Sequence, residues 1–226
     1  MKTKQLGLLV LSIILSVAAY CQTTPKVDFT EFIKEVQKWD KQDNEMSLTF
    51  WIPNTYWRIA LTNNPNIDEE LVDHIESIFE NYIFVCIADI EFTSQGTMNY
   101  TDEKNLRKSL SLVDSLGNKY LPLQDKQLDP EMVELIDGIR PMFAQMFGQM
   151  GEGMNFFLFE VKDKNGKNII DENEENTFKI NHSNKSFEFN LPIVSLMAPQ
   201  ACPVDNEEMK GNWNYCPIHG VKLGEE

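Results

Sequence analysis

Residues 83–92, Ile-Phe-Val-Cys-Ile-Ala-Asp-Ile-Glu-Phe, form a nearly continuous run of apolar and β-forming residues. A strand that lacks regular polar alternation is buried on both faces, as strands at the centre of a sheet are. Cys86 lies inside this run, and a buried free cysteine behaves as a small hydrophobic residue. The run therefore predicts a central strand, with Cys86 in a structural role and unpaired.

Further β segments occur on both sides of the central run. Each combines β-forming residues with turn-forming residues at its ends. One predicted hairpin surrounds Asp114 to Asn118, and another surrounds the turn Asp163-Lys164-Asn165-Gly166. The predicted strands are residues 46–52, 106–113, 119–123, 156–161, 167–170, 177–180 and 186–191.

Helical patterns alternate with these strands. Apolar residues recur at helical spacing in residues 28–41, 56–61 and from Asp68 to Tyr82. A fourth helix begins at Asp129-Pro130-Glu131, an N-cap followed by proline, and we expect Pro141 to kink or restart it. The sequence thus predicts an α+β fold, with an antiparallel β-sheet or sandwich core and three or four helices.

Four methionines follow Pro141 at a spacing of four: Met142, Met146, Met150 and Met154. A thioether stripe could hold Cu(I) in an oxidising compartment. Phenylalanines lie beside it, however, and methionine commonly fills irregular cores, so packing is the favoured interpretation. A groove for an apolar ligand or a partner helix is a further alternative.

The chain contains no recognisable catalytic constellation. It has no G-x-S-x-G, H-E-x-x-H or phosphate-binding glycine motif. Only three histidines are present, and we expect His74 and His182 to face solvent, on a helix and in a turn. No catalytic residue is therefore assigned.

The C-terminal segment from Ala201 carries ligand chemistry. Cys202 and Asp205 are three positions apart, and so are Cys216 and His219. A turn with this spacing directs two side chains at one ion, and two such turns supply the four ligands that tetrahedral zinc favours. Spacing alone thus predicts a metal site of Cys202, Asp205, Cys216 and His219.

This segment resembles the zinc-ribbon family, whose knuckles read Cys-Pro-x-Cys-Gly-x-x-Leu. Cys202-Pro203 matches the first knuckle, while Cys216-Pro217, Gly220 and Leu223 match the second. The resemblance implies a small structural zinc site. Asp205 and His219 replace the second cysteine of each knuckle, and the rest of the chain resembles only exported bacterial proteins of unknown function.

Three interpretations of the C-terminal segment remain open. The first is a structural zinc site with all four ligands. The second is a Cys202–Cys216 disulfide, which would close a loop of about 15 residues and stabilise the fold by about 3 kcal/mol. The third is a functional metal held by Cys202, Cys216 and His219, with Asp205 leaving a position open to water.

The N-terminus has the three regions of a secretory signal peptide. Lys2 and Lys4 precede the apolar run from Leu6 to Leu15, and small residues follow it. We expect cleavage after Cys21 and export to the periplasm or beyond the cell, as in a Gram-negative bacterium. The alternative keeps Cys21 as a lipid anchor, although Tyr20 before it fits a lipobox poorly. No segment is expected to span the membrane.

The chain is strongly acidic, with a formal net charge of −15 over 226 residues. Removing residues 1–21 takes away Lys2 and Lys4 and no acid, which moves the net charge from −15 to −17. Such a chain repels nucleic acid and anionic lipid, so an unknown protein or small molecule is the expected partner.

We therefore expect a signal peptide at 1–21, an α+β domain at 22–198 and a zinc-ribbon-like or disulfide-closed tail at 199–226. The favoured function is a non-catalytic binding or envelope-associated role with structural zinc in the tail. The alternative is a metal-dependent hydrolase or metal-handling protein that uses the same four side chains.

Overall fold

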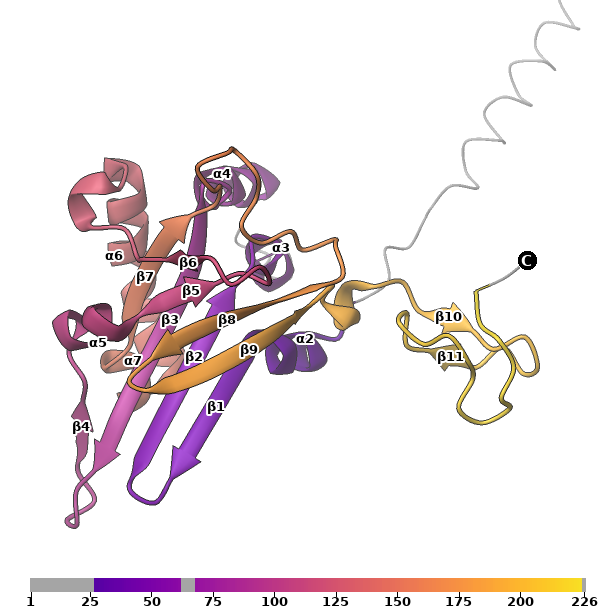
Figure 1. The fold of residues 1–226 in the computed structure, drawn as a ribbon, viewed down its shortest axis with the longest axis horizontal. Coiled ribbons are helices and arrows are strands. Elements are labelled where there is room, and N and C mark those ends of the chain that lie inside the picture. Colours follow the sequence, from indigo (N-terminus) through magenta and orange to yellow (C-terminus); the bar gives the residue numbers. More distant parts are fainter. Residues whose placement is uncertain (1–26, 62–67, 225–226) are drawn as a thin grey trace, which may run out of the picture.

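The computed structural model describes residues 27–61 and 68–224, and Figure 1 shows their arrangement. The expected signal peptide and the possible anchor at Cys21 lie outside the described residues. Within the described residues, no helix is long and apolar enough to cross a membrane.

The larger sheet is built around β3 (Tyr82–Phe92), as predicted. One edge of β3 pairs with β2 (Glu45–Ile52), which pairs in turn with β1 (Gln37–Gln42). The other edge of β3 pairs with β7 (Asn155–Glu160) along residues 82–87 and with β4 (Met98–Tyr100) along residues 90–92. All these pairs are antiparallel, and residues 83–90 are buried.

A second antiparallel sheet covers one face of the first. Its strands run in the order β6 (Lys119–Tyr120), β5 (Ser111–Val113), β8 (Asn176–His182) and β9 (Lys185–Leu191). Alternate residues of β8 and β9 are buried. The Trp51 ring of β2 lies 4.9 Å from that of Phe178 and 6.0 Å from that of Phe189, so the two sheets form a sandwich.

Helices cover the other face of the larger sheet. Trp57 stacks on Phe79 at 4.4 Å, Phe79 lies 5.2 Å from Phe84 of β3, and Phe143 packs 6.4 Å from Phe50 of β2. The described α-helices are α2 (Phe29–Val36), α3 (Thr55–Leu61), α4 (Glu69–Phe79), α5 (Glu103–Ser109), α6 (Pro130–Phe147) and α7 (Gln149–Glu152), with 3₁₀ turns η1 (Asp125–Gln127) and η2 (Val194–Leu196). The predicted α+β class is confirmed; the helices that the sequence did not predict are the short α5 and α7.

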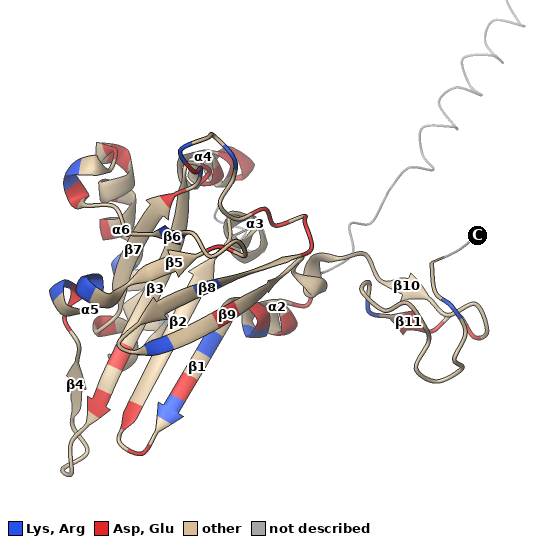
Figure 2. Cartoon of the chain, in the orientation of Figure 1, with Lys and Arg blue, Asp and Glu red and all other residues tan. Residues whose placement is uncertain are grey.

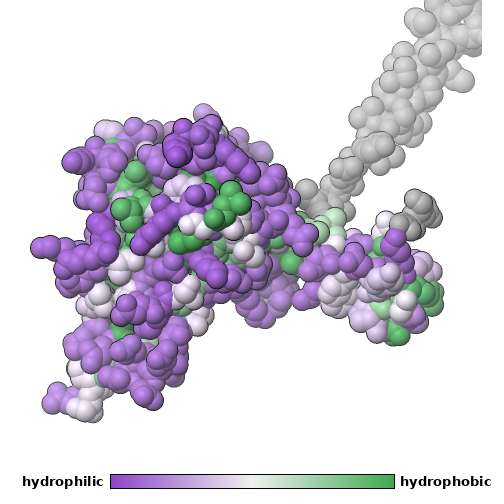
Figure 3. Space-filling view, in the orientation of Figure 1, coloured by the Kyte–Doolittle hydropathy of each residue, from purple (hydrophilic) through white to green (hydrophobic). Residues whose placement is uncertain are grey.

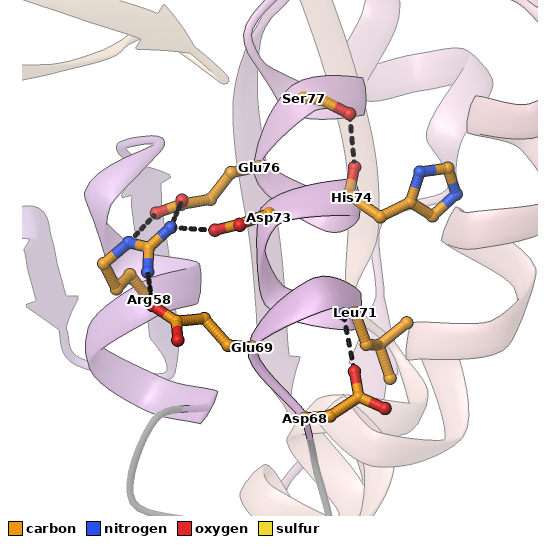
Figure 4. A network of polar contacts seen from close by, with 8 residues as sticks. All are labelled: Arg58, Asp68, Glu69, Leu71, Asp73, His74, Glu76 and Ser77. Atoms are coloured by element: carbon orange, nitrogen blue, oxygen red, sulfur yellow. Dashed lines mark hydrogen bonds and ion pairs between the residues drawn. The ribbon is translucent and has the colours of Figure 1, made fainter.

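Arg58 joins α3 to α4 (Figure 4). Its guanidinium contacts the carboxylates of Asp73 and Glu76 and lies 3.9 Å from that of Glu69. His74 points away from Arg58, is half-exposed and lies 3.1 Å from Glu131 of α6. The prediction of a surface position for His74 is therefore confirmed.

Two predicted boundaries were wrong, one for the helix at α2 and one for the strand that overlaps α5. The helix expected over residues 28–41 ends at Val36, because Gln37 is extended and residues 37–42 pair with β2. Trp39, one of the apolar residues of the predicted helix, is 49% exposed. Residues 106–109, expected to be a strand, are helical because the Asp102 carboxylate caps α5 by accepting the Asn105 N–H.

Pro141 does not restart the helix, since α6 runs through it to Phe147. A proline removes one helical hydrogen bond, here to the carbonyl of Asp137. Both residues are exposed, so water can satisfy that carbonyl. The helix ends instead at Gly148, whose φ is +58°.

The hairpin expected over residues 156–161 and 167–170 is reduced to one bridge, Lys162 with Asn168, while β7 forms its ladder with β3. Its turn is confirmed: the Asp163 carboxylate accepts the N–H groups of Asn165 and Lys167.

His182 is buried, at 1% exposure, so its predicted solvent-facing position was wrong. Strand β8 extends to His182, and the two-residue alternation that buries Phe178 and Ile180 also turns His182 inward. Its Nε2 lies 2.7 Å from Thr49 Oγ1 on the facing sheet. Figure 2 shows acidic residues spread over the helices and the strand ends.

Candidate metal centre

The C-terminal tail begins after η2 and projects from the sandwich (Figure 1). The Glu35 carboxylate of α2 holds η2 by accepting the N–H groups of Val194 and Ser195 at 2.6 and 2.8 Å. The tail contains the strand pair β10 (Gln200–Ala201) and β11 (Glu208–Met209). Its small core is separate from the main one and consists of Cys202, Met209, Cys216 and Leu223.

Two turns of the same geometry form the tail. In each turn the cysteine N–H donates to a carbonyl five residues later, and the residue four positions later donates to the cysteine carbonyl. The four bonds are Cys202 to Glu207, Asn206 to Cys202, Cys216 to Val221 and Gly220 to Cys216, at 2.8–2.9 Å.

The backbone at the fifth position of each turn is left-handed, with φ of +61° at Asn206 and +65° at Gly220. Asparagine and glycine are the residues that adopt this conformation most readily. Asp205 in the first turn therefore occupies the position that His219 occupies in the second.

Cys202, Cys216 and His219 form a cluster that is close enough to hold a metal ion. Their ligand atoms all lie within 4.8 Å of one another. His219 Nδ1 lies 3.4 Å from Cys202 Sγ and 3.6 Å from Cys216 Sγ. Zinc bonds of about 2.3 Å to sulfur and 2.0 Å to nitrogen place those atoms about 3.5 Å apart in a tetrahedron. The spacing therefore fits a zinc-sized ion.

The cysteines of the cluster are buried and unbonded. Cys202 and Cys216 are 0% and 1% exposed, and neither forms a disulfide in the structure. Cys86 is also buried and free, as predicted.

Asp205 lies beside the cluster but outside the set of three. Its Oδ2 is 3.7 Å from His219 Nδ1, while its Oδ1 accepts the Glu207 N–H at 3.0 Å. This backbone bond, with Cys202 and His219 nearby, holds the pKa of Asp205 below its ordinary value despite partial desolvation. The carboxylate is thus ionised and adjacent to the ligand atoms.

The thiols differ in acidity. Desolvation raises the pKa of Cys202 above its ordinary value, although the N–H groups of Val204 and Asp205 oppose it. Desolvation acts on Cys216 too, but the N–H groups of His219 and Ile218, together with the side chains of His219 and Cys202, hold the pKa of that thiol below its ordinary value. Amides aimed at sulfur favour the thiolate, which is the form that binds metal.

The methionines at spacing four occupy different environments. Met142 is 36% exposed, Met150 packs against the main core, and Met154 is buried in it. Met146 belongs to α6, but its side chain is outside the described set. Because α6 ends at Gly148, Met142 and Met150 do not lie on the face of one helix.

Sequence reasoning missed one residue that supports the site. The Gln200 side-chain amide donates to the carbonyls of Gly211 and Trp213 at 2.7 and 2.9 Å, which fixes the segment that joins the two turns. A lone glutamine carries no sequence signal for this role.

No protein-family model, curated protein or solved structure matches this chain. The likeness of the tail to a zinc ribbon therefore depends on its own residues and geometry.

Proposed function

We propose that the chain is an exported, non-catalytic protein with a binding or envelope-associated role, whose tail is folded around one structural zinc ion. The observation that carries this proposal is the spacing of about 3.5 Å between His219 Nδ1 and the two cysteine sulfurs. Asp205 is the fourth ligand, because it stands at the position of His219 in the equivalent turn and its Oδ2 lies 3.7 Å from His219 Nδ1.

A structural role is favoured over catalysis because the two cysteine ligands belong to a small core, although His219 and Asp205 lie at its surface. The two cysteines are packed with Met209 and Leu223, all at most 5% exposed. The two described cavities are lined by residues of the main domain. A catalytic zinc would need an open position beside a substrate cleft.

A binding role is supported by apolar side chains on the outside of the tail. Val204 and Ile218 hold equivalent positions, directly before Asp205 and His219, and are 58% and 64% exposed. Figure 3 shows hydrophobic surface at the end of the tail that faces away from the sandwich. Zinc would hold these two residues in fixed positions for a partner.

Metal content and free thiols, measured on one chelator-free sample, test the proposal. We expect about one zinc per chain with Cys202 and Cys216 reduced. His219→Ala and Asp205→Ala should lose zinc at a lower chelator concentration than wild type, while Glu208→Ala, an exposed acid of the same tail, should not.

Two outcomes would reject the structural zinc site. Absence of metal with a Cys202–Cys216 disulfide would leave a tail that is closed covalently. Bound zinc that Asp205→Ala retains, together with exchangeable metal-bound water, would favour a three-ligand functional site and thus the alternative of a metal-dependent hydrolase or metal-handling protein.

A further inference from the structure

The two sulfur atoms of the tail cluster lie close enough to bond to each other. Cys202 Sγ, Cys216 Sγ and His219 Nδ1 are all within 4.8 Å of one another. Two thiolates on a tetrahedral zinc ion are about 3.7 Å apart, and the sulfurs of a disulfide are about 2.05 Å apart. A disulfide therefore forms in the zinc-bound tail if the sulfurs approach by about 1.7 Å.

Formation of one disulfide removes both sulfur ligands from the metal at once. Metal ligands must be deprotonated, and the sulfurs of a disulfide carry no negative charge. The imidazole of His219 and the carboxylate of Asp205 then remain, whereas a structural zinc ion takes four ligands. Zinc binding and the Cys202–Cys216 disulfide therefore exclude each other.

The cluster is open to solvent on one side. Cys202 and Cys216 are buried, but the side chains of His219 and Asp205 beside them are 31% and 39% exposed. A small oxidant can therefore reach the sulfurs when these two side chains move aside. Cys86 differs, because it is buried in the main core, apart from the cysteines of the tail core.

We propose that the tail is a redox switch, in which a hydroperoxide converts the two zinc thiolates into a Cys202–Cys216 disulfide and the zinc ion is released. This inference rests on the proposed zinc site and adds a means of regulating it. The reduced tail holds zinc and the oxidised tail does not, so the redox state of two thiols determines whether the metal is bound.

The reaction has two steps. One thiolate sulfur attacks the hydroperoxide, whose O–O bond breaks, and a sulfenic acid forms while the other oxygen leaves as an alcohol, or as water from hydrogen peroxide. The second thiolate then attacks the sulfenic sulfur, the S–S bond forms, and hydroxide leaves as water. The two sulfurs together lose two electrons, which the peroxide oxygens gain, and solvent supplies two protons.

Oxidation would change the surface that the tail presents to a partner. The exposed apolar residues Val204 and Ile218 directly precede Asp205 and His219. Zinc fixes each turn at its cysteine and at the ligand three positions later, whereas a disulfide fixes the cysteines alone. The segments that carry Val204 and Ile218 therefore lose one of their two fixed ends on oxidation.

Peroxide treatment of the reduced, zinc-loaded full chain tests the switch. A chromogenic chelator measures released zinc against an untreated sample, and peptide mass spectrometry after alkylation of the remaining thiols identifies the sulfur products. We expect loss of about one zinc for each Cys202–Cys216 disulfide that forms, while Cys86 stays reduced. Dithiothreitol with added zinc should restore the thiols and the metal.

The two steps of this experiment separate the two proposals. A reduced chain that takes up no zinc contradicts the zinc site itself. A loaded chain that keeps its zinc and its thiols in excess hydrogen peroxide overturns the switch alone. Release of zinc with sulfinic or sulfonic acid at the cysteines, in place of the disulfide, also overturns it.

Methionine oxidation is the competing cause of metal release. Met209 belongs to the same small core as the two cysteines, and peroxide also oxidises thioethers. Met209→Leu removes the thioether and nearly keeps the volume, so we expect this variant to release zinc at the wild-type rate. A Met209→Leu chain that retains its zinc would overturn the proposal. Should that variant fail to fold, zinc release that follows Met209 sulfoxide rather than the disulfide in wild type overturns it.

Discussion

His182 is a buried, uncharged imidazole between the two sheets. Its pKa is lowered to about 4, chiefly by desolvation and to a smaller extent by Lys185, while Asp89 acts in the opposite direction. Lys185 Nζ lies 3.4 Å from Asp89 and 3.3 Å from Glu45, so the charges around His182 are already paired. Its Nδ1 is buried without a partner among the described residues.

This environment makes stability depend on pH. An unfolded histidine binds its proton below about pH 6.5, but folded His182 does so only near pH 4. The unfolded state therefore holds more protons in that interval, and the free energy of unfolding should fall by up to about 3 kcal/mol as the pH drops from 6.5 to 4.

Urea unfolding of wild type and His182→Gln at pH 7 and 4.5 checks this prediction. Glutamine can keep a bond to Thr49 without titrating. In His182→Gln the free energy of unfolding should therefore differ much less between pH 7 and pH 4.5 than it does in wild type. His74→Gln, the same change on the surface, is the control and should retain the wild-type difference. Equal differences for wild type and His182→Gln would contradict the prediction.

The burial of His182 also shows why its position was mispredicted. The expected turn spanned residues 181–185, but the actual turn is the two-residue Ser183-Asn184, with φ of +48° and +61°. Two-residue turns with both φ positive match the twist of paired strands. The sequence Ser-Asn lacks the glycine that signals such a turn, so the last inward residue of β8 was assigned to the turn.

At the scale of the elements, Pro141 is an unexpected interior residue of α6. Central strand β3 and the pair β8–β9 were predictable because their apolar pattern determines their burial. The ends of α2 and α5 were not, since pairing with β2 and the Asp102 cap override the local pattern. The helix continues through Pro141 instead of restarting there, because solvent exposure makes its lost hydrogen bond tolerable.

Replacing Pro141 should stabilise the domain. Pro141→Ala restores a helical hydrogen bond, and an interior proline costs about 3 kcal/mol relative to alanine. Greater freedom of the unfolded chain offsets up to about 1 kcal/mol, so we expect a gain of about 1–2 kcal/mol in thermal or urea unfolding. Pro130→Ala, at the first helical position, should give no gain. A destabilised Pro141→Ala with an unchanged helix would contradict this account.

In the whole molecule, two hydrophobic cores are connected by η2 and its link to α2. The main core spans both sheets and the helices, whereas the tail core contains four buried residues. So small a core buries too little apolar surface to fold alone, and a metal or a covalent link is the usual remedy. The sequence spacing of the four candidate ligands was predictable. The distances between the ligand atoms, and the exclusion of Asp205 from the close cluster of Cys202, Cys216 and His219, were not.

Loss of the metal should therefore affect the tail alone. We expect Cys216→Ser to raise backbone hydrogen exchange across residues 200–224 while leaving the unfolding free energy of the main domain within about 0.5 kcal/mol of wild type. Cys86→Ser, the matched change in the central strand, should destabilise the main domain. A loss of several kcal/mol in Cys216→Ser would show that the two cores fold as one.

Zinc X-ray absorption on the purified full chain tests the central claim that the tail is organised by one zinc ion. We predict two sulfur neighbours at about 2.3 Å and two nitrogen or oxygen neighbours at about 2.0 Å. Zinc surrounded by light atoms only, or a chain that holds no zinc, would contradict the claim.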